Sequence, residues 1–264
     1  MVKLRRTLLI LLLPTVFLHI VAACPAHAAD PRVLGRGTAY TAVARGPLAT
    51  LWNPAGATAT PGVHGAIAAG LSPAGSSLLF GVSIAAVGSP TVTWSTAQDG
   101  DERKMLGTFA FSILPRTAVG GGISYRSSDR PGGISFQLGL LHSEPQWAIG
   151  ASLAHLGAGI FGAEIPLSFR VGGALDATPG VTLTLDLHSV TGRWKVAVGG
   201  AAQVWVVDIR WGTAILLVGG IDRLGFGIGF DLFGLRIDLA LGACGGDLRP
   251  YGSLGIEVAI PAWW

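Results

Sequence analysis

The chain has few charges, few cysteines and, after its first 28 residues, no long apolar run. Only 12% of its 264 residues are charged, about half the fraction typical of soluble domains. No apolar stretch beyond the N-terminus approaches the ~18 residues that a membrane-spanning helix needs. The two cysteines, Cys24 and Cys244, form no disulfide framework pattern and no metal-ligand spacing. These absences argue against an ordinary soluble domain, a helical membrane protein and a cysteine-rich scaffold.

Motifs for catalysis and for nucleotide binding are also missing. The chain contains no G-x-S-x-G, no H-E-x-x-H and no P-loop. Residues 225–229, GFGIG, lack the spacing and the following helix of a dinucleotide-binding loop. One of the scattered histidines could pair with a serine at a rim, as in a membrane lipase, but no spacing supports that alternative; they are His64, His142, His155 and His188. We therefore expect no enzyme activity, no cofactor and no metal.

Residues 1–28 have the pattern of a secretory signal peptide. A basic start, KLRR, precedes an apolar stretch at 8–23 and an A-x-A cleavage pattern at 26–28. An alternative is a lipobox that would make Cys24 a lipidated first residue. Both readings predict export. Removal of this segment would remove Lys3, Arg5 and Arg6 and leave 15 basic and 15 acidic side chains. The high pI of the full sequence therefore gives no support for nucleic-acid binding.

What the chain does have is a repeated alternation of apolar with small or polar residues. Half of the residues are hydrophobic and the mean hydropathy is +0.56. Val181, Leu183 and Leu185 share one face of an extended strand, and Thr184 and Asp186 lie on the other. A closed barrel of such strands satisfies every backbone polar group in lipid without helices. The pattern predicts an all-β, antiparallel transmembrane β-barrel.

About fourteen strands are predicted, and the short connections leave little room for external loops. Twelve strands would relieve that crowding, and residues 203–208 fit either one bent strand or a tight turn. The weakest segment is 91–96. The expected strands lie near residues 63–71, 77–87, 91–96, 105–113, 117–126, 133–142, 146–155, 166–175, 180–188, 193–203, 205–213, 224–231, 234–241 and 251–260.

Charged residues at the alternate strand positions that are expected to face the lumen are the main candidates for a lumen site. Their signs are balanced, so they fit a mutually paired network that holds the barrel together, or a polar constriction that a solute passes. Many other inward positions are Gly, Ala or Ser, which leaves space in the lumen for a plug or a ligand. The candidate lumen charges are Arg170, Asp186, Lys195, Asp208, Arg210, Asp231, Arg236, Asp238 and Glu257.

Residues 35–56, GRGTAYTAVARGPLATLWNPAG, come just before the first expected strand. This Gly-rich piece, ending in Asn53, Pro54, Ala55 and Gly56 and followed only by alternating strands, resembles the FadL/PorV family of bacterial outer-membrane barrels. The resemblance implies fourteen strands, a plug segment at residues 29–62 and a barrel at 63–264. The family usually has an acidic pair before this motif, and here the residues are Ala-Arg-Gly at 44–46.

The resemblance further implies passive uptake of hydrophobic small molecules across the outer membrane. We single out the motif together with Trp52, which would wedge the plug or line an exit. The remaining tryptophans fit a membrane-interface girdle. The expected partners are outer-membrane lipid, a hydrophobic solute and the barrel-assembly machinery, which reads a terminal aromatic such as Trp264.

Two other hypotheses stay open. One is a PorV-like scaffold that serves a secretion or surface-attachment system and transports nothing; the scarcity of loops counts against it. The other is a soluble exported β-sandwich, whose outer strand faces should carry charges that this chain lacks.

Overall fold

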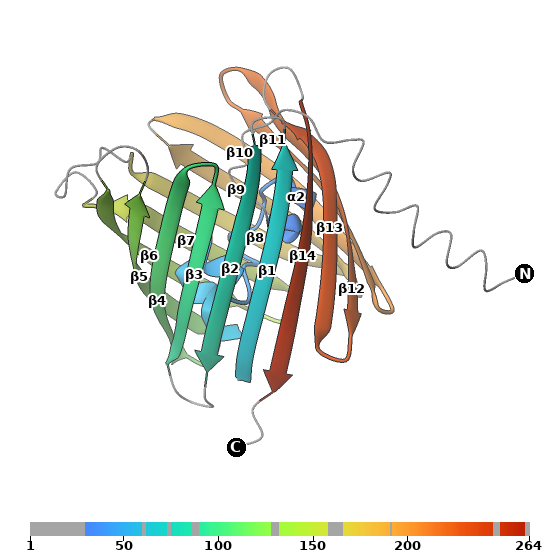
Figure 1. The fold of residues 1–264 in the computed structure, drawn as a ribbon. Coiled ribbons are helices and arrows are strands. Elements are labelled where there is room, and N and C mark those ends of the chain that lie inside the picture. Colours follow the sequence, from blue (N-terminus) through green and yellow to red (C-terminus); the bar gives the residue numbers. More distant parts are fainter. Residues whose placement is uncertain are drawn as a thin grey trace, which may run out of the picture.

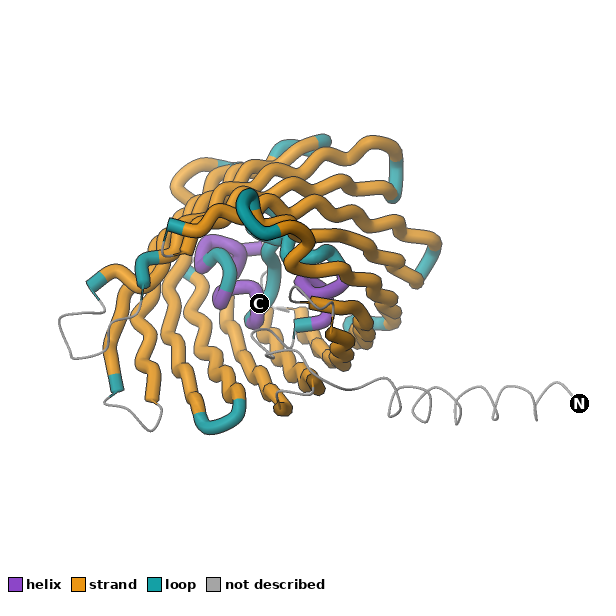
Figure 2. The backbone as a smooth tube through the Cα atoms, turned by 90° about the horizontal axis from the view of Figure 1, so that it is seen from above, coloured by secondary structure: helices purple, strands orange, loops and turns teal. Residues whose placement is uncertain are grey.

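The computed structural model describes residues 30–59, 62–72, 75–85, 90–127, 132–157, 166–190, 192–244 and 249–261. These residues form one closed antiparallel β-barrel with the N-terminal segment inside it (Figures 1 and 2). The expected signal peptide at 1–28, the lipidation alternative at Cys24 and the terminal aromatic at residue 264 lie outside the described residues, and they stay predictions.

In the described part of the chain the wall has fourteen strands, each paired with its neighbour in sequence. Pairing of β1 with β14, from Gly62 opposite Pro261 to Leu71 opposite Gly252, closes the ring. The fourteen-strand barrel is therefore confirmed, and the twelve-strand alternative is wrong. The strands are β1 Gly62–Ser72, β2 Gly75–Ala85, β3 Thr91–Asp99, β4 Glu102–Leu114, β5 Thr117–Ser127, β6 Gly133–Ser143, β7 Trp147–Leu156, β8 Ser168–Thr178, β9 Val181–Val190, β10 Arg193–Val204, β11 Val207–Leu216, β12 Gly220–Leu232, β13 Leu235–Cys244 and β14 Arg249–Pro261.

Two uncertain segments of the sequence take definite forms. The weakest expected strand, at 91–96, is longer in the structure and pairs along its length with both neighbours. Residues 203–208 contain a tight turn, because Val204 is paired with Val207 across Trp205 and Val206. Trp205 takes a φ of 55°, a left-handed conformation that bulky residues rarely adopt. The turn therefore joins two separate strands, β10 and β11.

The alternation of residue types corresponds to two faces of the wall. On β9, Leu183 and Leu185 are 45% and 55% exposed on the outside, whereas Thr184 and Asp186 are 4% and 3% exposed on the inside. The same division recurs around the ring, where the outward faces carry exposed Leu, Ile, Val and Phe. Within the described residues, no helix has the length and apolar character needed to cross a membrane.

Residues 30–59, here called the N-terminal segment, run through the lumen (Figure 2). The segment contains the short helix α2 Pro31–Gly35 and the 3₁₀ helices η1 Leu48–Leu51 and η2 Pro54–Ala59. The side chain of Asp30 caps α2 by accepting the N–H of Arg32. Helix α2 contacts β11 to β14, and η2 contacts β3 to β6, so the segment bridges nearly opposite arcs of the ring.

The two rims of the barrel differ. One rim carries the tight turns at residues 115–116, 179–180, 205–206 and 233–234 and the end of β14, and we call it the C-terminal rim. The other rim carries the turn at residues 100–101 and the connection between β7 and β8, and we call it the loop rim. In Figure 1 the C-terminal rim lies at the bottom, beside the C-terminus.

Candidate functional site

Asn53 fixes one end of the N-terminal segment to the wall. The side chain is fully buried, and its Nδ2 donates to the carbonyl oxygens of Thr41 (3.2 Å) and of Leu140 on β6 (3.0 Å). Its Oδ1 accepts the N–H of Ala55 at 3.1 Å. Pro54 restricts Asn53 to an extended backbone and begins η2. One amide thus joins two parts of the segment to the barrel wall.

The rest of the motif packs where the wall has no side chains. A Cβ on Gly139 would lie 2.2 Å from Oδ1 of Asn53, and one on Gly120 would lie 2.5 Å from the carbonyl carbon of Pro54. Ala55 is fully buried against residues of β5 and β6, and a Cβ on Gly56 would collide with the carbonyl of Ala44. The motif therefore fits against the wall backbone itself, and only glycine allows that approach.

Asp186 holds the middle of the segment. Its Oδ2 accepts three hydrogen bonds, from the N–H of Tyr40 (2.9 Å), the N–H of Thr41 (2.8 Å) and Oγ1 of Thr41 (2.6 Å). The carboxylate is 3% exposed and projects inward from β9. A charged acceptor forms stronger hydrogen bonds than a neutral one. Asp186 is therefore a strong anchor between wall and segment.

Helix α2 is held by charge and by a row of glycines. Arg32 pairs with Asp30 on the segment and with Glu257 on β14. Beside α2, directly paired glycines run across four adjacent strands; they are Gly199, Gly212, Gly225 and Gly242. A Cβ on Gly225 would lie 1.9 Å from the carbonyl oxygen of Leu34. The segment backbone thus lies directly on the wall backbone.

Five of the expected lumen charges form one network on β11, β12 and β13. Arg210 is fully buried and pairs with Asp238. Oδ2 of Asp208 lies 3.2 Å from Nε of Arg210. Arg236 pairs with Asp208 at 2.6 Å and with Asp238 at 3.0 Å. The fifth member, Asp231, is more than half exposed and lies 3.8 Å from Arg236. The network joins β11, β12 and β13. Of the two interpretations of the lumen charges, these contacts fit a mutually paired network that holds the barrel together.

The other two expected lumen charges have different partners. Lys195 pairs with Asp222 across β11 at 2.5 Å. The guanidinium of Arg170 lies over the Trp52 ring, 4.4 Å from its centroid. Trp52 itself is half-buried and packs against a cluster formed by Leu34, Ala240, Cys244 and Tyr251. Trp52 therefore wedges between the segment and the wall, and Arg170 covers one face of its ring.

Burial and nearby charges shift the ionisation of three segment residues. Burial raises the pKa of Tyr40, so its hydroxyl stays protonated. Burial lowers the pKa of Arg36, and this outweighs the opposite effect of Tyr40 and Asp208. Burial would also lower the pKa of Arg32, but Asp30, Tyr40 and Glu257 raise it well above its ordinary value. Nearby charges thus compensate the burial of the Arg32 cation, whereas they do not fully compensate the burial of the Arg36 cation.

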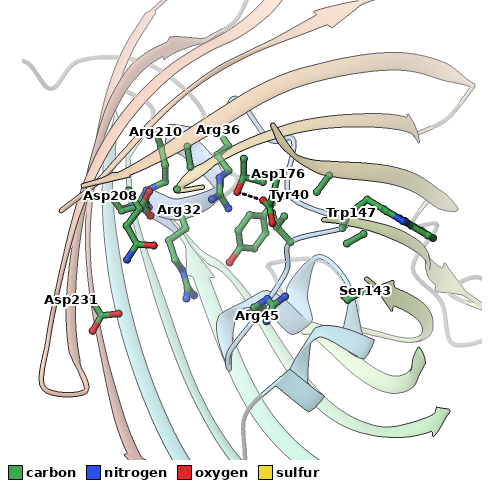
Figure 3. A pocket seen from close by; sticks show the side chains of 18 of the residues that line it. Arg32, Arg36, Tyr40, Arg45, Ser143, Trp147, Asp176, Asp208, Arg210 and Asp231 are labelled. Atoms are coloured by element: carbon green, nitrogen blue, oxygen red, sulfur yellow. Dashed lines mark hydrogen bonds and ion pairs between the residues drawn. The ribbon is translucent and has the colours of Figure 1, made fainter. Parts of the chain in front are cut away.

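A cavity of about 350 Å³ opens between the segment and the wall at the C-terminal rim (Figure 3). Arg32, Arg36 and Tyr40 border it from the segment, and Arg210 borders it from the wall. Arg236 also lines it from the wall. Apolar side chains complete the lining, and they include Ala42, Val43, Trp147 and Ala174. Among the described residues, no group of three or more His, Cys, Asp or Glu side chains is placed to hold a metal.

Several contacts were not predicted from the sequence. Asp30 and Arg32 were not singled out, although Asp-Pro before a short apolar run is a recognisable helix start. The histidines were treated as isolated, and the structure corrects this for His188, whose Nε2 lies 3.0 Å from Oγ of Ser168. The cross-strand neighbours of His188 are Arg170 on β8 and Lys195 on β10, two cations rather than the carboxylate of a catalytic triad.

No protein-family model and no curated protein sequence matches the chain. Among solved structures, the toluene transporter TbuX from Ralstonia pickettii superposes with a TM-score of 0.69 at 12% identity, covering 87% of this chain and 98% of TbuX. A porin mutant from Rhodopseudomonas blastica superposes with a TM-score of 0.46 at 11% identity, covering 75% and 99%. The likeness to TbuX shows a common fold, and the resemblance of the N-terminal motif to the FadL/PorV family stays a prediction.

Proposed function

We propose that this protein is an outer-membrane β-barrel through which hydrophobic small molecules pass passively, and that the N-terminal segment closes the lumen until it moves. The observation that carries the proposal is how the lumen is filled. The chain's own N-terminal segment occupies it, and the buried wall residues around that segment are mostly glycine, alanine, serine and threonine. Movement of the segment would therefore leave an open passage.

The outer surface supports placement in a membrane. Its strands are 9 to 13 residues long, and a tilted strand needs about 9–11 residues to span the hydrocarbon core. The outward side chains are apolar around the ring. In bacterial barrels of this kind short turns face the periplasm. By that rule the C-terminal rim faces the periplasm.

The anchors of the segment support movement as a unit. They comprise the amide of Asn53, the carboxylate of Asp186 and the ion pair of Arg32 with Glu257. Each is a polar contact that water can replace, and the segment also packs Leu34, Leu48 and Ala55 against apolar side chains of the wall. TbuX, which has the same fold, is described as a toluene transporter, and this makes a hydrophobic cargo the first choice to test.

Uptake into liposomes tests the proposal directly. The full chain is refolded into vesicles, and entry of a neutral hydrophobic dye is compared for the wild type, Asn53→Ala and an exposed control, Arg193→Ala. We expect dye entry above that of empty vesicles, with a faster rate for Asn53→Ala because one anchor is lost. Heat-modifiable gel mobility verifies that each barrel is folded. Folded barrels with no uptake in any variant would contradict transport and favour the scaffold alternative.

A further inference from the structure

Cys244 is a buried, oxidised cysteine at the loop rim. It is the last residue of β13, it is 3% exposed, and it packs in one cluster with Tyr251 and with Leu34 of α2. No cysteine in the described part of the chain is free, and Cys244 is disulfide-bonded. The sequence contains one other cysteine, Cys24, so a single chain offers only one partner for this bond.

The described chain begins within reach of Cys244. Figure 1 shows α2 beside β13 and β14, and a Cβ on Gly255 of β14 would lie 2.9 Å from Cγ of Pro31. Gly255 is paired with Asp238, which precedes Cys244 by six residues on β13, a rise of about 20 Å. Residues 24–29 precede the described chain and can span up to about 20 Å. A connection of that length is therefore sufficient to bring residue 24 to the end of β13.

The bond requires that Cys24 remains in the mature chain. Cleavage after Ala28 would remove it, and lipidation would consume its thiol. Residues 21–23, VAA, form a second small-residue cleavage pattern directly before Cys24. Cleavage there leaves Cys24 as the first residue, with an unmodified thiol. Export carries both thiols into an oxidising compartment, where disulfides form and persist.

We propose that Cys24 and Cys244 form an intramolecular disulfide in the mature protein, and that this bond tethers the N-terminal segment to β13 at the loop rim. Two S–H bonds of the chain break and one S–S bond forms. By exchange, the disulfide of an exported oxidoreductase is reduced to two thiols and takes up the two electrons and two protons. The bond does not depend on the proposed transport, but its consequence does. A tethered segment cannot leave the barrel, so a passage must open while the segment stays within the reach of residues 24–29.

Peptide mapping without reductant tests the bond. The full sequence, leader included, is expressed in a bacterial host that exports it, and the barrel extracted from the membrane fraction is alkylated before digestion with trypsin. We expect an N-terminus at Cys24, an intact mass lower by two hydrogens than after reduction, and one cross-linked species that contains Cys24 and Cys244. Cys24→Ser and Cys244→Ser are the matched controls, because each should lack this species and gain one alkylated thiol.

Three results would overturn the proposal. A mature chain that begins at Ala29 would lack one half of the bond. An acylated Cys24 would have no thiol left for it. A disulfide-linked dimer on a gel run without reductant would mean that Cys244 bonds to a second copy of the chain.

Hydrogen exchange reports the tether itself. The N–H of Leu34 donates to the carbonyl oxygen of Asp30 at 3.1 Å, within α2. Because a tether raises the effective concentration of the segment at the wall, Cys24→Ser should speed exchange of this amide at least about tenfold. A reductant should have the same effect on the wild type and none on Cys24→Ser. Equal exchange in the linked wild type and in Cys24→Ser would refute the tether.

Dye uptake into vesicles separates the disulfide from the proposed transport. Cross-linked chains without uptake in any variant would refute transport and keep the disulfide. Uptake by chains that lack the cross-linked species would refute the disulfide and leave transport standing.

Discussion

Replacing Asp186 should release the N-terminal segment from the wall without unfolding the barrel. Its Oδ2 accepts three hydrogen bonds from Tyr40 and Thr41, at 2.6 to 2.9 Å. Hydrogen bonds to charged groups contribute about 1.5–3 kcal/mol each, and bonds to one oxygen are not additive. We therefore assign about 3 kcal/mol to the anchor as a whole, which corresponds to about a 150-fold change in the fraction of released segment. Asp186→Ala should show this full change, and Asp186→Asn, which retains a neutral acceptor, about tenfold.

Two assays report release. Hydrogen exchange should accelerate at the amides of Tyr40 and Thr41, because these groups donate to the carboxylate. Trypsin should cleave faster after Arg45, which is exposed at the C-terminal rim. Asp176→Asn is the matched control, since Asp176 accepts a threonine hydroxyl within the wall. If Asp186→Ala and Asp176→Asn leave exchange at these two amides equally unchanged, the anchoring role of Asp186 is refuted.

Two further perturbations test the packing and the charge network. Gly225→Ala places a Cβ 1.9 Å from the carbonyl oxygen of Leu34, so it should weaken docking of the segment by about 1–3 kcal/mol and speed trypsin cleavage. Gly107→Ala, which has open space around its Cβ, should leave the cleavage rate unchanged. Equal cleavage rates for the two variants would contradict the close packing. Arg210→Ala removes the fully buried cation of the network and leaves Arg236 to pair with both Asp208 and Asp238, so it should destabilise the barrel by about 3 kcal/mol. The loss should appear as a lower temperature for the gel-mobility shift, which the exposed Arg193→Ala should not change.

The strands could be predicted from the sequence because their signal is local. Alternation such as Leu183, Thr184 and Leu185 reflects two solvents on the two sides of one strand, and it needs no knowledge of the partner strand. The same parity places Arg210 and Asp238 on the inner face. Their pairing, however, depends on register between β11 and β13, which alternation does not encode.

The anchors of the segment could not be predicted, because they join residues far apart in sequence. Asp186 lies 145 residues from the Thr41 amide that it accepts, and no local pattern around either residue specifies the other. The partner of Lys195 was missed for a different reason. Asp222 is the residue of β12 that the register shift leaves without a register partner on β11, and the strand was expected to begin only near residue 224. Bulges of this kind interrupt the alternation that defines a strand end.

The ion pair of Arg32 with Glu257 has a consequence for assembly. It spans 225 residues, from the first described helix to the last strand. Contacts of such separation form late, because the loop that they close is costly in chain entropy. The segment is made first, yet its docking surfaces on β9 and on β11 to β14 are made last. This order predicts that a nascent barrel passes through a stage with an unfilled lumen, and that docking of the segment is the final step of folding.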